Sequence, residues 1–103
     1  MTVPFMSVGA VGVISVASNL IPKAMSDLVE ACLAGDWAGA RKLHAEYYGL
    51  FRAFLKLDTN PVPIKTALGL AGAIDPVVRL PMSAMRESGV AELRRSLEEL
   101  KLI

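Results

Sequence analysis

The stretch GAVGVISVASN, residues 9–19, decides how the rest of this chain of 103 residues is interpreted. It carries a short apolar run, rich in β-branched residues, with glycines at its entrance and polar residues at its exit. Such a run is typical of a strand that is buried on both faces within a parallel sheet. We therefore expect one strand at residues 12–17, and no other segment resembles it. Because a parallel strand needs a neighbour on each side, the sequence predicts a part of a larger domain.

The composition supports this interpretation and excludes some classes of function. Hydrophobic residues make up 53% of the chain and the mean hydropathy is +0.46, which suggests apolar faces that are meant for partners. The 11 basic and 10 acidic residues nearly cancel, and no basic stripe with interleaved aromatic residues indicates nucleic-acid binding. The lone Cys32 excludes an intramolecular disulfide and fits the reducing cytoplasm. Residues 1–22 are uncharged, but glycines, prolines and polar residues interrupt them, so we favour a buried strand over a membrane span.

Apolar residues at helical spacing predict helices on both sides of the strand. Thr2 is expected to cap a short helix over residues 5–8, and Asn19 to cap a helix over residues 22–34. Gly35 should end that helix and Asp36 should cap the next, a helix of about twenty residues antiparallel to it. The stripe on this long helix is Trp37, Ala40, Leu43, Tyr47, Leu50, Phe54 and Leu57.

Prolines divide the last part of the chain. We expect Asn60 to cap a helix that has Pro61 at its first position and ends at Gly72. An extended crossing over residues 74–82 should follow, and then a helix from near Ser88. Its inward face is Val90, Leu93, Leu97 and Leu100. The predicted fold class is therefore mostly α with a single β-strand.

The residues by themselves do not make a complete active site. Gly9 and Gly12 precede the strand, whereas a phosphate-binding loop follows one. His44 has no second histidine at ligand spacing, so no metal site is expected. An enzyme segment, a half-barrel that acts by association and an independent helical binding module remain open.

Three blocks carry a resemblance to a known family: GVISVASN at residues 12–19, NPVPIK at 60–65 and RLPM at 79–82. They resemble the C-terminal portion of the dihydrodipicolinate synthase and N-acetylneuraminate lyase family of pyruvate-dependent aldolases, and the synthase branch in particular. The resemblance implies an α/β (β/α)₈ TIM barrel with a C-terminal helical extension. Residues 1–34 would then be the end of the barrel, with the end of helix seven, strand eight and helix eight, and residues 35–103 the extension.

The resemblance also implies an activity that this chain does not carry alone. Family members are cytoplasmic lyases of lysine biosynthesis, here expected as homotetramers, and they need no added cofactor. They join pyruvate to a barrel lysine as a Schiff base and condense it with aspartate 4-semialdehyde. Ile14 alone matches a family site position, as a pyruvate contact made through the main chain. Tyr47 and Tyr48 do not match the family's proton-relay tyrosines, and none of the lysines matches the Schiff-base position: Lys23, Lys42, Lys56, Lys65 and Lys101.

The expected partners are therefore the substrates of a complete enzyme and the missing N-terminal part of the barrel, with neither nucleic acid nor membrane. The segment is predicted to be inactive alone. The alternatives are a truncated or split half-barrel that acts only by association, and another pyruvate-dependent aldolase of the same family.

Overall fold

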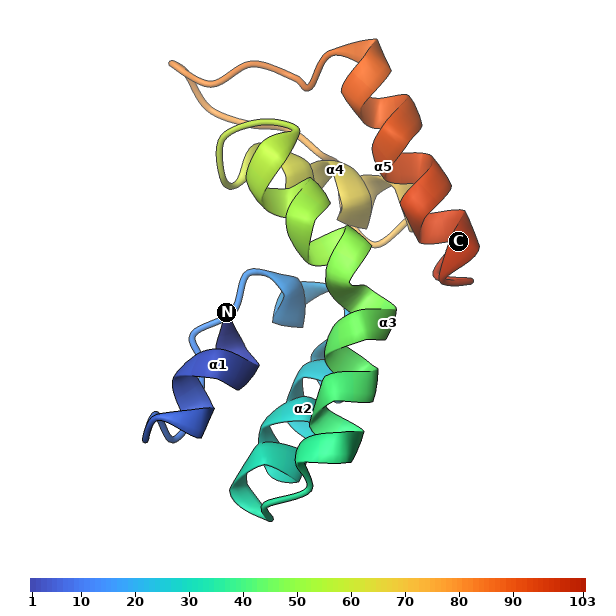
Figure 1. Ribbon diagram of the computed structural model, residues 1–103. Coiled ribbons are helices and arrows are strands. Elements are labelled where there is room, and N and C mark those ends of the chain that lie inside the picture. Colours follow the sequence, from blue (N-terminus) through green and yellow to red (C-terminus); the bar gives the residue numbers. More distant parts are fainter. The chain divides into compact units, whose positions relative to one another are not determined.

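The computed structural model describes all residues from 1 to 103 and divides them into two compact units. Unit 1 comprises residues 1–48 and unit 2 comprises residues 49–103, so that the boundary falls inside one long helix (Figure 1). The predicted division into residues 1–34 and 35–103 refers to a complete barrel and stays a prediction.

Unit 1 is built from short helices around a small apolar core. It contains α1 (Thr2–Ser7), the 3₁₀ turn η1 (Ala17–Asn19), α2 (Pro22–Leu33) and the first turns of α3 (Trp37–Lys56). Helix α1 and turn η1 both pack against α2. The core cluster consists of Val3, Met6, Leu28, Cys32 and Ala40, with Val29, Ala31, Trp37 and Leu43 packed against it.

The turn between α2 and α3 forms as predicted from its two central residues. Gly35 has φ of +74°, a conformation that suits glycine, and ends α2. The Asp36 carboxylate then accepts a 2.9 Å hydrogen bond from the Gly39 N–H in the first turn of α3. In Figure 1, α2 runs down to this turn and the first turns of α3 run back up beside it. The predicted antiparallel pair is confirmed.

Unit 2 has a core of its own. Helix α4 (Val62–Leu70) packs against α5 (Glu87–Glu99), and the last turns of α3 belong to the same unit. Gly72, at φ of +72°, follows the end of α4 as predicted. The side chains buried in this unit are Leu50, Ala53, Phe54, Val62, Pro63, Ile64, Ala67, Met85, Leu93 and Leu97.

The predicted strand at residues 12–17 is absent from the structure, which holds five α-helices and no strand. Residues 11–15 are irregular, and Ala17 already belongs to η1. A strand is defined by hydrogen bonds to a neighbouring strand, and nothing else in this chain has the pattern to provide one. The apolar run was identified correctly, but its conformation depends on a partner.

Three predicted helix caps are also wrong. Thr2 lies inside α1, which follows Met1, and α4 begins at Val62 after Pro61 instead of after Asn60. Asn19 lies in η1, where its side-chain amide donates to the Val16 carbonyl at 3.0 Å, and α2 begins only at Pro22. In each case the capping residue type was present, but neighbouring turns set the first residue of the helix.

The longer features agree with the sequence. Helix α3 has 20 residues, the extended crossing over residues 74–82 contains no helix, and α5 begins at Glu87, one residue before the predicted start. On the predicted inward face of α5, Leu93 and Leu97 are fully buried, and Val90 and Leu100 are partly buried. No helix has both the length and the apolar character that a membrane crossing requires.

Candidate functional site

The candidate site is the irregular segment at residues 11–16, which contains the predicted pyruvate contact. Residues 11–14 make no hydrogen bond within the chain. The first hydrogen bonds of the segment are made by Ser15. Its side-chain oxygen accepts from the Ser18 N–H at 3.2 Å, and its carbonyl accepts from the Ser18 hydroxyl at 2.6 Å. These two bonds turn the chain into η1. The four residues before them keep every backbone donor and acceptor available.

Ile14 lies at the centre of this unpaired segment. Its side chain is fully exposed, and Val11 and Val13 beside it are exposed as well. A cluster of exposed β-branched side chains on a backbone without hydrogen bonds is unusual on the surface of a complete folded protein. The predicted contact between the main chain of Ile14 and pyruvate stays a prediction, and both its N–H and its carbonyl are available for it.

A hollow of about 400 Å³ adjoins this segment within unit 1. Its lining combines apolar side chains with hydroxyl groups and one carboxylate. The lining residues are Gly12, Val13, Ser15, Ser18, Pro22, Met25, Ser26, Val29 and Glu30. In this lining the Ser26 hydroxyl donates a 3.1 Å hydrogen bond to the Glu30 carboxylate. The lining contains no histidine, cysteine or lysine, and its mixed character suits the packing of another protein segment.

The lysines of the chain do not form a Schiff-base site. Lys23 is exposed and pairs with Asp27 at 2.7 Å. The hydrogen bond and the charge of Asp27 raise the pKa of Lys23, and this stabilises the protonated form, which is not the nucleophile. Lys65 donates a 2.8 Å hydrogen bond to the backbone carbonyl of Val77. None of the five lysine side chains is buried in an apolar pocket of the kind that activates a catalytic amine.

The tyrosines and the histidine lie together on α3. The rings of His44 and Tyr48 are 5.6 Å apart at an angle of 54°. Desolvation by burial, followed by the charge of Glu46, raises the pKa of Tyr47 above its usual value. A raised pKa moves a phenol away from proton transfer at neutral pH. No group of three or more histidine, cysteine or acidic side chains is placed to hold a metal ion.

Sequence reasoning missed a feature of unit 2. A hollow of about 470 Å³ lies between α4 and the extended crossing, lined by Pro61, Lys65, Val77, Val78, Arg79 and Met82. The sequence signal was present in the blocks at residues 60–65 and 79–82, which supply most of this lining. The separation of the two blocks along the chain hid their proximity.

Similarity to known proteins covers almost the whole chain. The sequence model of the Dihydrodipicolinate synthetase family matches residues 1–100. The 4-hydroxy-tetrahydrodipicolinate synthase of Methanosarcina barkeri is 46% identical over 103 residues, which are 100% of this chain and 35% of that protein. The enzyme of the same name from Geobacter sulfurreducens is 45% identical over 102 residues, 99% of this chain and 35% of the relative.

The solved structures agree with the sequences. The crystal structure of dihydrodipicolinate synthase from Thermotoga maritima matches with a TM-score of 0.95 and 37% identity. The match covers 99% of this chain and 34% of that one. The chain thus spans about a third of the length of the relatives that it matches. With a family match over residues 1–100, the chain belongs to the dihydrodipicolinate synthetase family.

Proposed function

We propose that this chain is the C-terminal segment of a 4-hydroxy-tetrahydrodipicolinate synthase. In the complete enzyme, pyruvate would form a Schiff base with a barrel lysine and condense with aspartate 4-semialdehyde, a lyase-type step of lysine biosynthesis in the cytoplasm. This segment would supply one wall of the pyruvate pocket and the helical extension. By itself it would be inactive, because it has no residue that matches the Schiff-base lysine.

The observation that carries the proposal is the unpaired apolar segment at residues 11–14 in a chain that otherwise has buried cores. As strand eight of a (β/α)₈ barrel, the segment would gain a neighbour on each side, and its free N–H and carbonyl groups would pair. The exposed side chains of Val11 and Val13 would gain apolar cover at the same time. Residues 1–34 would then complete the barrel and residues 35–103 would form the extension.

Ile14 would lie toward the carboxyl end of that strand. Active sites of such barrels lie at the C-terminal ends of the strands. A main-chain contact from Ile14 to pyruvate agrees with its free N–H and carbonyl groups and with the apolar character of its own side chain. The complete enzyme would be a homotetramer, as the resemblance implies.

The second candidate is a half-barrel that acts only by association with another chain. The exposed apolar groups around Ile14 favour it, since they are suited to binding a partner strand whether or not a reaction follows. Another pyruvate-dependent aldolase of the same family is the third candidate, and it differs in the aldehyde substrate alone.

Complementation separates these candidates. The chain is produced together with the remaining N-terminal part of the Methanosarcina barkeri relative in a bacterium that lacks the synthase and depends on added diaminopimelate. Growth without the supplement supports the enzyme segment. Co-purification of the two parts without growth favours association alone. If the co-purified parts condense pyruvate only with another aldehyde, the third candidate is favoured. If the two parts do not co-purify and growth is not restored, the proposal is overturned.

A further inference from the structure

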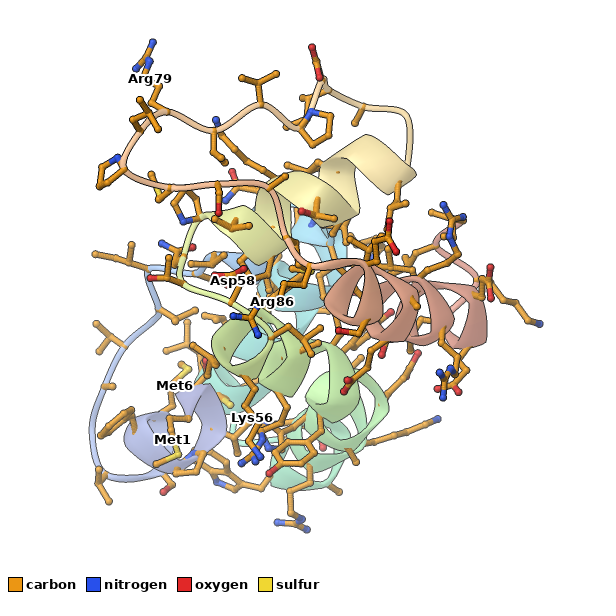
Figure 2. All side chains as sticks on the ribbon, turned by 90° about the horizontal axis from the view of Figure 1, so that it is seen from above. Met1, Met6, Lys56, Asp58, Arg79 and Arg86 are labelled. Carbon is orange, nitrogen blue, oxygen red and sulfur yellow. The ribbon has the colours of Figure 1, made fainter.

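The segment at residues 73–86, here called the arm, joins α4 to α5 without regular structure. Its two ends continue into the helices, and its tip carries exposed side chains, among them Leu80 at 91% exposure. Figure 2 shows Arg79 at this tip, projecting outward from the arm. A segment of this length without its own backbone ladder needs anchors to keep one conformation.

The first anchor is a hydrogen bond from Lys65. Its Nζ atom donates at 2.8 Å to the carbonyl of Val77, twelve residues further along the chain. This is the only hydrogen bond between a side chain of α4 and the arm. Because the donor is charged, the bond is stronger than one between neutral groups.

The second anchor is the close approach of the Pro76 ring to the backbone of α4 at Gly69. A Cβ atom placed on Gly69 would lie 2.8 Å from Cγ and 2.9 Å from Cβ of Pro76, closer than side chains tolerate. Pro76 therefore occupies the space that a larger residue at position 69 would take. Lys65 and Gly69 are four residues apart, one helical turn, so both anchors lie on the same face of α4.

Both anchors hold neighbouring residues of the arm, Pro76 and Val77. The hollow of about 470 Å³ lies beyond them, between Lys65 and Pro61 on one side and residues 77–79 and Met82 on the other. We propose that the hydrogen bond from Lys65 holds the tip of the arm on α4. The tip separates from α4 when this bond is lost, while the buried side chain of Met85 keeps the C-terminal end of the arm in the core. Because Gly69 has no side chain, the arm can lie close enough to α4 for the hydrogen bond between Lys65 and Val77 to form.

The proposal is tested by limited proteolysis of the full chain with trypsin, at low protein concentration. Arg79 is already exposed, but trypsin must draw the residues around it into its cleft. The rate of cleavage after Arg79 therefore reports how freely the tip of the arm leaves α4, and cleavage after Arg94, inside α5, reports unfolding of the unit. Lys65→Met keeps the length of the side chain but removes the donor, and cleavage after Arg79 should become about tenfold faster. Lys65→Arg keeps a charged donor and should cleave at nearly the original rate. Cleavage after Arg94 should not change.

The matched control is Lys42→Met, the same substitution on α3 at a lysine that makes no hydrogen bond to the arm. It should leave cleavage after Arg79 unchanged. The result that overturns the proposal is an unchanged rate after Arg79 in Lys65→Met, or an equal rise in Lys42→Met. A parallel rise after Arg94 overturns it too, since Lys65 would then stabilise the whole unit and not the arm.

Gly69→Ala gives an independent check from the second anchor. The added methyl group displaces Pro76, so cleavage after Arg79 should accelerate although Lys65 is intact. Gly49→Ala is its control, because a Cβ at Gly49 meets nothing within 4 Å. Equal rates in the two alanine variants would remove Gly69 from the mechanism.

Discussion

The carboxylate of Asp36 accepts a 2.9 Å hydrogen bond from the backbone N–H of Gly39 and so satisfies one of the free donors at the start of α3. Gly39 itself contributes space, since a Cβ at this position would collide with the Asp36 carboxylate. The start of α3 therefore depends on both residues: Asp36 supplies the acceptor, and Gly39 leaves room for it.

Asp36→Ala should lower the free energy of unfolding by about 1 kcal/mol, because it leaves the Gly39 N–H without its acceptor. Asp36→Asn keeps a side-chain oxygen and should retain most of the stability. Urea unfolding followed by circular dichroism measures both variants. Equal stability of the alanine variant and the original chain would mean that water replaces the cap at no cost.

Leu93→Ala should destabilise the chain by about 2–5 kcal/mol, because Leu93 is fully buried in the core of unit 2 and its removal leaves a cavity. Leu80→Ala is the matched control. Its side chain is 91% exposed, so the same substitution should change stability by less than about 0.5 kcal/mol. Thermal unfolding of the two variants provides the comparison, and a similar loss in both would contradict the assignment of the core.

Cys32 should react slowly with a disulfide reagent at pH 8 in the folded chain. It is buried in the cluster of unit 1, and burial raises the pKa of its thiol, so both access and the thiolate fraction are reduced. Leu28→Ala, in the same cluster, should accelerate labelling. Leu55→Ala, at a site 79% exposed, should not. Fast labelling of the original chain without denaturant would show that unit 1 is open.

Borohydride reduction in the presence of pyruvate should leave the mass of the chain unchanged, because none of its lysines lies in an activating pocket. A complete family enzyme treated in the same way is the positive control. Mass spectrometry after reduction detects the adduct. A stable pyruvate adduct on any of the five lysines would contradict both this prediction and the proposed origin of the Schiff base.

Substitutions at Ile14 test the main-chain contact in the complemented enzyme. Ile14→Ala should leave the KM for pyruvate within a few-fold, because the backbone is kept, while stability falls by about 2–5 kcal/mol if the barrel buries the side chain. Ile14→Val should change little, and Ile14→Pro should abolish activity because the N–H is lost. Steady-state kinetics on folded variants measures these effects. A hundredfold rise in KM for Ile14→Ala at unchanged stability would assign the contact to the side chain.

Sequence predicted best what depends on neighbouring residues. Gly35 and Asp36 set the end of one helix and the start of the next through their own conformation and side chain, and both were identified. Three- and four-residue spacing likewise placed Leu93 and Leu97 in the core. These features need no knowledge of the distant chain.

The failures depend on partners. The run around Ile14 has the composition of a strand, but strand geometry comes from hydrogen bonds that this chain does not supply, so the segment is irregular. The bond from Lys65 to Val77 was missed because it depends on the path of the arm, which no periodicity encodes. At the candidate site, Ile14 followed from family resemblance alone, since an isoleucine side chain carries no chemical signal.

The contact between Gly69 and Pro76 should also couple the substitutions that these two positions accept during evolution. A Cβ at position 69 would lie under 3 Å from the Pro76 ring, so a substitution at one position alters what the other tolerates. Homologous chains with alanine at position 69 should therefore carry a residue smaller than proline at position 76. Covariation between these two columns, seven residues apart, would be the evolutionary trace of the arm lying against α4.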